Sequence, residues 1–323
     1  MHRGTVLRTA LALMLMLGVS VVTIGTPATA ATTGRYRTQP MRTVPAPVNL
    51  GLSVTVKAGT THLVSSYLVV GGASTLTLVS HLVYCRLAGS ATVTERIVTG
   101  QNVLRATKVT LLTRALVTAP ATGDLTCRLY AIFFRLTTGR VGGTINVLSG
   151  TSLMQSGTSL NRLATPIQSS AQTWQDGRVL VNTSYRAAPV RFTPVEGTDS
   201  IQAFGDVNVT VCYDGGKDRG SCLGAGSRRS ALFASVGTQL VVQQLQADGT
   251  VCRTMVNGPL VATRISNTIH HWKFNKSVSN IAVSSTCTSP EFRAYLRVTT
   301  SRIANSIVVE ENHQSETALY VRP

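Results

Sequence analysis

One fifteen-residue stretch of this sequence occurs twice in similar form. Residues 133–147 read FFRLTTGRVGGTINV, and residues 295–309 read YLRVTTSRIANSIVV. Aligned without a gap, the two stretches share six identical residues of fifteen, and most mismatches exchange similar residues. The match predicts an internal duplication, in which two copies of one fold follow each other along the chain.

The cysteines extend the match toward the N-terminus. Cys127 falls opposite Cys287, and Cys85 falls opposite Cys252. In an exported chain, an even count of six cysteines indicates disulfides. Zinc is the alternative, but the sequence has no C-x-x-C pair. If the copies share a fold, the predicted bridges are Cys85–Cys127, Cys252–Cys287 and, by elimination, Cys212–Cys222; the rival pairing joins Cys212 to Cys252.

Short alternating runs predict strands throughout. Residues 52–56 (LSVTV) alternate apolar and hydroxyl side chains, which is the period of a half-buried strand. Similar β-branched runs, bounded by Gly, Pro and Asn, recur without a sustained helical period. Residues 123–127 (GDLTC) resemble the approach to the second cysteine of immunoglobulin domains, with Leu125 in place of the usual Tyr. The predicted fold is all-β, with two tandem disulfide-bridged β-sandwich domains.

The predicted sandwiches occupy residues 49–148 and 190–323. About 290 residues after an export signal favour two domains over one, since single cores stop growing near ~250 residues. Between the two domains, residues 149–189 begin with a stretch dominated by Ser, Gly and Thr. We expect a linker or a long surface loop there.

The first thirty residues predict secretion. Two arginines precede an apolar run at residues 10–24, and the small residues Ala28 and Ala30 follow it, which is the order of a cleavable export signal. A membrane anchor is the alternative, but the run is shorter than the ~20 residues that span a bilayer. We expect removal of residues 1–30, an extended leader at residues 31–48, and an extracellular mature chain with no later transmembrane segment.

Positive charge is concentrated in the first domain. The formal net charge of the chain is +17. Residues 31–150 hold twelve Lys and Arg against only Glu95 and Asp124, whereas residues 190–323 hold thirteen against ten acids. A positive field attracts anionic polymers. Arginine-rich composition without a ligand is the alternative, because 25 of the 30 basic residues are Arg.

No arrangement of residues predicts catalysis, a metal site or a cofactor. In the first domain the candidates for acid–base chemistry are Glu95, Asp124, His62 and His81, and no local motif joins them. The sequence also lacks a nucleophile elbow, a zinc-protease motif and a phosphate-binding glycine loop. We therefore predict no catalytic residue, no metal and no cofactor.

The segment between Cys212 and Cys222 is the one locally dense set of charges. It includes DGGKDRG at residues 214–220, where the aspartates depart from the spacing of a calcium loop. A rigid hairpin tip is the plain interpretation. The other is a binding loop, with the candidate residues Lys217, Arg219, Arg228 and Arg229.

These patterns together predict a secreted, non-enzymatic protein that binds or coats something at the cell surface. The expected partner is an anionic cell-wall or extracellular polymer. It would bind through the basic first domain, and the second domain would bind it weakly or not at all. An exported hydrolase or inhibitor with a site built from loops is the alternative.

Overall fold

The computed structural model describes residues 34–37, 46–90, 95–105, 107–135, 143–153, 166–174, 177–180, 183–187, 189–211, 233–256, 260–266, 271–300, 307–309 and 314–322. These residues form β-strands in four antiparallel sheets and no helix. Accordingly, the described part of the chain has no helix long and apolar enough to cross a membrane. The predicted all-β class is confirmed.

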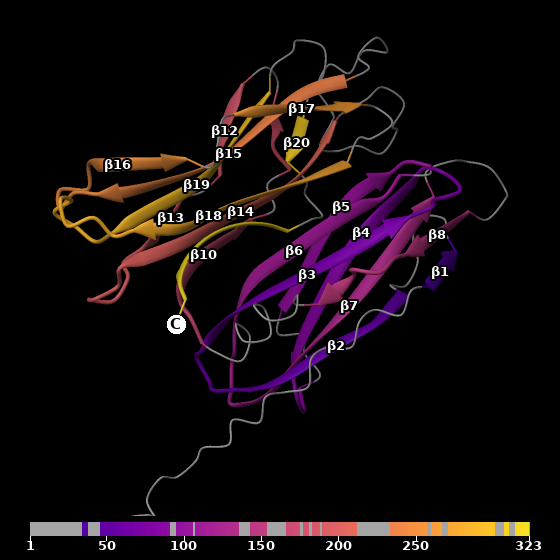
Figure 1. Ribbon diagram of the computed structural model, residues 1–323, viewed down its shortest axis with the longest axis horizontal. Coiled ribbons are helices and arrows are strands. Elements are labelled where there is room, and N and C mark those ends of the chain that lie inside the picture. Colours follow the sequence, from indigo (N-terminus) through magenta and orange to yellow (C-terminus); the bar gives the residue numbers. More distant parts are fainter. Residues whose placement is uncertain are drawn as a thin grey trace, which may run out of the picture.

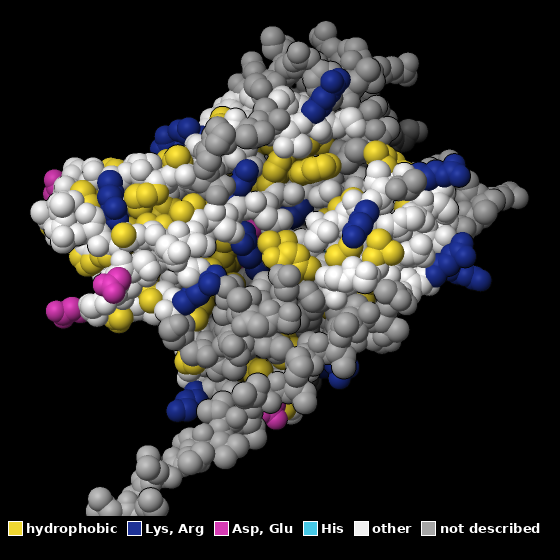
Figure 2. Space-filling view, in the orientation of Figure 1, with side chains coloured by type: hydrophobic (Ala, Val, Ile, Leu, Met, Phe, Trp, Pro, Cys, Tyr) yellow, Lys and Arg dark blue, Asp and Glu magenta, His cyan; other side chains and the backbone are white. Residues whose placement is uncertain are grey.

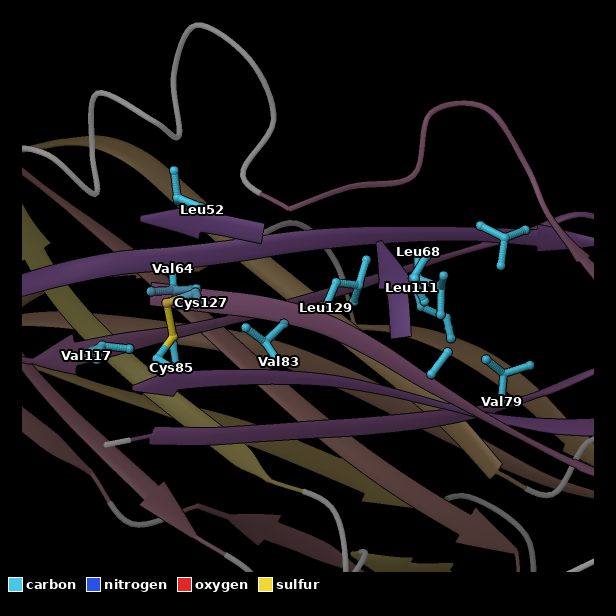
Figure 3. Close-up of a cluster of buried hydrophobic side chains, with 14 of the residues drawn as sticks. Leu52, Val64, Leu68, Val79, Val83, Cys85, Leu111, Val117, Cys127 and Leu129 are labelled. Carbon is cyan, nitrogen blue, oxygen red and sulfur yellow. A yellow bond between two sulfur atoms is a disulfide. The ribbon is translucent and has the colours of Figure 1, made fainter. Parts of the chain in front are cut away.

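The first sandwich consists of two sheets around one hydrophobic core (Figure 1). Its strands are β1 (Gly34–Arg37), β2 (Ala46–Val56), β3 (Thr61–Gly71), β4 (Thr77–Leu87), β5 (Glu95–Val103), β6 (Val109–Thr118), β7 (Gly123–Arg135), β8 (Thr144–Val147) and β9 (Ser152–Leu153). One sheet has the order β1–β8–β3–β6, with β9 also on β3, and the other has the order β2–β7–β4–β5. Both sheets fill the core, with Val64 and Leu68 from β3 and Val83 and Leu129 from β4 and β7 (Figure 3).

The second sandwich has a separate core. Its strands are β10 (Gln168–Trp174), β11 (Val179–Leu180), β12 (Ser184–Arg186), β13 (Val190–Phe192), β14 (Ser200–Val211), β15 (Phe233–Leu245), β16 (Val251–Val256), β17 (Val261–Ser266), β18 (His271–Ala282), β19 (Phe292–Thr300), β20 (Ile307–Val309) and β21 (Ser315–Val321). One sheet has the order β10–β21–β14–β20–β11, with β18 also on β14. The other has the order β12–β19–β15–β16, with β13 on β19 and β17 on β15. Val207, Leu240 and Phe292 are among the residues of this core.

The two sandwiches share one strand connectivity. In the first, β3 pairs with β6, β8 and β9; in the second, β14 pairs with β18, β20 and β21. Likewise, β7 lies between β2 and β4, and β19 lies between β12–β13 and β15. The corresponding strands follow each other in the same chain order. The chain therefore forms two tandem sandwiches, and their shared pairing pattern is the one that an internal duplication predicts.

The fifteen-residue match covers two pairs of strands. Aligned residues face the same way in β8 and β20 but opposite ways in β7 and β19. Val147 of β8 and its aligned residue Val309 of β20 both lie in the cores. Phe133 of β7 also lies in the first core, but its aligned residue Tyr295 stands between two core residues of β19 and faces outward. A slip of one residue exchanges the two faces of a strand. The ungapped alignment is therefore wrong for β7 and β19.

Both long disulfides form as predicted. Cys85 and Cys127 are directly opposite each other on β4 and β7, with 4.0 Å between their Cα atoms. Cys252 of β16 is bonded to Cys287, which lies between β18 and β19. The first bond stays within one sheet, unlike the inter-sheet bond of immunoglobulin domains. Because β4 corresponds to β15 and not to β16, Cys85 and Cys252 are not equivalent positions, although the two pairings are right.

Cys212 and Cys222 lie outside the described residues, and their pairing stays a prediction. We expect the mature protein to contain no free thiol, because the other cysteines are bonded to each other. Alkylation under denaturing, non-reducing conditions followed by peptide mapping should recover one peptide pair that joins Cys212 to Cys222. Labelling of either cysteine would contradict the pairing.

Segments expected to lie outside the sandwiches contribute strands to them. β1 belongs to the expected leader at residues 31–48 and pairs with β8. β9 to β12 belong to residues 149–189, where we expected a linker or loop; β9 pairs with β3, and β10 pairs with β21. β10 reads QSSAQTW and has no fully buried residue. An edge strand needs little apolar surface, so its composition resembles that of a linker.

The sandwiches pack through the outer faces of two sheets (Figure 1). Leu63 of β3 forms a small apolar cluster with Phe204 of β14 and Tyr320 of β21. Beside it, the Leu116 N–H donates to Glu316 Oε1 at 3.1 Å. β14 is consequently buried on both faces over most of its length. One face meets its own core and the other meets the first sandwich.

Charged groups are buried at this interface. Arg114 of β6 donates from Nη2 to Asp206 Oδ1 of β14 at 2.7 Å and from Nε to Oδ2 at 3.0 Å. Lys273 of β18 is buried nearby, and burial lowers its pKa to about 8, although the Asp206 carboxylate acts in the opposite direction. These contacts set one orientation for the two sandwiches.

Candidate functional site

The predicted binding loop lies outside the described residues. This holds for Lys217, Arg219, Arg228 and Arg229, and for the cysteines that enclose the first two. The candidate site is therefore built from strands that the structure describes.

Exposed cations cover the first sandwich. Among its described side chains, seven Lys and Arg are exposed, against one exposed carboxylate, that of Asp124. Asp124 accepts a hydrogen bond from Thr55 Oγ1 at 2.6 Å. In Figure 2 the Lys and Arg side chains are spread over the visible face and form no single block. The seven cations are Arg35, Lys57, Arg37, Arg86, Arg105, Lys108 and Arg128.

A hollow at the sheet edge brings two of these cations together. β1 is the edge strand of its sheet, and Arg35 and Arg37 are exposed on it. Tyr36 between them is half-buried, and its ring centre lies 5.2 Å from that of Phe133. These three residues and Thr144 line a cavity of about 540 Å³, in which Arg35 Nη2 donates to Thr144 Oγ1 at 3.2 Å.

The hollow is suited to holding an anion. Each guanidinium presents several N–H donors in a planar fork that matches an oxoanion. Burial raises the pKa of Tyr36, so its hydroxyl stays protonated. Among the described lining residues there is no acid, histidine or cysteine for bond-breaking chemistry.

Among the catalytic candidates of the first sandwich, His81 lies beside a serine hydroxyl group. His81 Nε2 lies 3.0 Å from Ser66 Oγ, but both side chains are completely buried. Burial, and then the positive charge of Lys273, lowers the pKa of His81 to about 3. Its Nδ1 has no hydrogen-bond partner among the described residues, so the third member of a catalytic triad is missing there. Of the others, His62 is buried on β3, Asp124 is exposed on β7, and the Glu95 side chain is not among those described.

Comparison with known proteins identifies no family. No family model and no curated protein matches the chain. Matching solved structures include the VP2 subviral particle of infectious bursal disease virus, with 9% identity over 92% of this chain and 77% of that chain and a TM-score of 0.26. They also include the tandem CBM22-1–CBM22-2 domain of Xyn10C from Paenibacillus barcinonensis, with 11% identity over 90% and 93% of the two chains and a TM-score of 0.26. At such TM-scores the likenesses carry no argument.

The described part of this chain is thus a pair of packed β-sandwiches, the first of which presents an exposed excess of cations.

Proposed function

We propose that this protein is a secreted, non-enzymatic protein that binds an anionic cell-wall or extracellular polymer through the basic surface of its first sandwich. The observation that carries the proposal is the excess of seven exposed cations over one exposed carboxylate among the described side chains there. Such an excess attracts polyanions. Secretion is supported by the export signal predicted at residues 1–30 and by the two disulfides, which persist in oxidising compartments.

The hollow beside β1 is where we expect the polymer to be held. Arg35 and Arg37 are two residues apart on one strand, so both project to the same side. The polymer would run along this sheet edge and place its anionic groups between the two guanidinium groups. The other cations act at longer range, where salt screens them.

The test distinguishes binding in this hollow from binding by positive charge spread over the whole first sandwich. Arg35→Gln combined with Arg37→Gln is expected to weaken heparin binding by about tenfold or more, because charge-assisted contacts are lost. The matched control is Arg86→Gln with Arg128→Gln, which removes the same charge from exposed positions on the other sheet. We expect the control to weaken binding less than about threefold. Titration calorimetry of the full mature chain with heparin measures both.

Equal losses in the two double variants would show that charge acts diffusely and that the hollow is not the site. Absence of heparin binding by the unmodified chain at low salt would overturn the proposed function itself.

A further inference from the structure

The register of the second sandwich places arginines opposite arginines. Core residues of β19 alternate with Arg293 and Arg297, which therefore face outward. Arg191 of β13 is directly opposite Arg293, and Arg186 of β12 is directly opposite Arg297. Like charges in opposed positions destabilise a sheet. The two pairs are about 13 Å apart along β19, at ~3.3 Å per residue.

Two of these arginines are held by neutral groups. Arg293 donates from Nε and Nη2 to Gln243 Oε1, at 3.1 and 2.6 Å. The Arg186 guanidinium lies over the Tyr295 ring, 5.3 Å from its centre. By contrast, Arg191 Nη1 lies 3.0 Å from the Glu291 carboxylate. An amide or an aromatic ring orients a cation without neutralising it. The positive charges of Arg186 and Arg293 can therefore still attract an anion.

A small pocket lies between these two arginines. The edge strand is interrupted between β12 and β13, where Pro189 has no backbone N–H for the ladder. Around the gap, Arg186, Arg293 and Tyr295, with Ala187 and Pro189, line a pocket of about 130 Å³. One water takes about 30 Å³ of liquid volume. The pocket therefore has room for one carboxylate or sulfate group.

We infer that this pocket binds an oxoanion of an acidic polysaccharide, and that the outer face of β12, β13 and β19 around it is a second binding surface. This inference goes beyond the function proposed for the first sandwich, and it does not depend on that function. The net charge of the second domain is nearly balanced, so counting charges in the sequence does not reveal this surface. Asp206, Glu316 and Lys273 count toward that balance but are buried at the interface between the sandwiches, so the exposed surface carries fewer acids than the sequence count indicates.

The surroundings of the pocket favour a polysaccharide over a nucleic acid. Gln243 and Thr299 lie on the same face of the sheet and are already hydrogen-bonded, to Arg293 and Thr254 and to Gly237. The Gln243 amide keeps a second N–H, and the Thr299 hydroxyl oxygen keeps its lone pairs, so both can still hydrogen-bond to sugar hydroxyl groups. Single-stranded nucleic acids need aromatic rings on which bases stack. Tyr295 is only 7% exposed and lies under Arg186, so the pocket offers no such platform.

The experiment uses the full mature chain carrying Arg35→Gln and Arg37→Gln, so that the first sandwich does not mask the second. In this background, Arg186→Gln with Arg293→Gln is expected to weaken binding of polysaccharide by about tenfold or more. The probes are polygalacturonate, which carries carboxylates, and heparin, which carries sulfates; the tighter one identifies the oxoanion. Arg264→Gln is the control, because it removes an exposed charge on β17, away from the pocket.

Arg186→Gln alone should leave the melting temperature unchanged or raise it, since it relieves a like-charge pair. A loss of binding without a loss of stability therefore supports the pocket. Equal effects of Arg264→Gln and Arg186→Gln, or undiminished binding by the double variant, would overturn it. Tighter pocket-dependent binding of a single-stranded DNA oligonucleotide than of either polysaccharide would overturn the choice of ligand.

Discussion

Replacing Asp206 by alanine is expected to lower the free energy of unfolding by about 3–5 kcal/mol, because it leaves a buried arginine without its counter-charge. The side chains of Arg114 and Asp206 are only 11% and 2% exposed. Burial by itself would lower the pKa of Arg114, but the ion pair with Asp206 outweighs burial and raises that pKa. Arg114 therefore stays charged. Its guanidinium also covers the Phe204 ring at 4.5 Å, which leaves it little room to reach water.

Urea unfolding followed by tryptophan fluorescence measures this loss, because both tryptophans, Trp174 and Trp272, lie in the second sandwich with Asp206. The matched control is Glu291→Ala, which breaks the more exposed pair with Arg191 and should cost at most about 1 kcal/mol. Replacing both buried partners by apolar residues should recover most of the loss. If Asp206→Ala costs no more than Glu291→Ala, the sandwiches are not joined by this pair.

Acid is expected to destabilise the protein through His81. Burial, and then Lys273, lowers its pKa to about 3 from an ordinary value of 6.5. Between these values the unfolded chain binds a proton that the folded chain does not. Stability is therefore fully present above pH 6.5 and falls as the pH drops toward 3, by about 1.4 kcal/mol per pH unit. From pH 7 to pH 5 the loss from this group is about 2 kcal/mol.

The measurement is the free energy of unfolding from pH 7 to pH 4 for the unmodified chain and for His81→Gln. Glutamine cannot take up a proton, so the variant should lose this part of the pH dependence while its stability at pH 7 falls. An identical pH dependence in both proteins would assign the acid sensitivity to other groups.

The fold could be predicted from the sequence because its signals are local. Alternating runs predict strands, and a repeat predicts two copies, without any knowledge of which strands pair. The register within the copies could not be predicted. The aligned residues Phe133 and Tyr295 have similar chemistry, yet one fills a core and the other faces outward. The sequence does not distinguish an aromatic residue on the core face of a strand from one on the outer face.

The two long disulfides could be predicted even though part of the alignment behind them was wrong. Cys85 and Cys252 are on strands that do not correspond, β4 and β16. The pairing survived because cysteines only need to be neighbours within their own copy, and each predicted pair was local to one copy. Equivalence between the copies was not required.

The surface could be predicted only in part. Counting charges found the basic first domain, because seven of the eight Lys and Arg side chains that the structure describes there are exposed. In the second domain a count of charged residues treats the buried Asp206 like an exposed carboxylate. The pairs of Arg186 with Arg297 and of Arg191 with Arg293 depend on strand pairing between distant segments. No sequence pattern contains that information.

We propose that exposed cations of this protein bind an anionic polymer. Titration of the unmodified mature chain with heparin across a series of salt concentrations tests this proposal. We expect tight binding at low salt and a linear fall of log K with log salt, with a slope that becomes shallower by roughly one for each cation contact removed. Binding that is absent at low salt, or that does not change as salt rises, would contradict it.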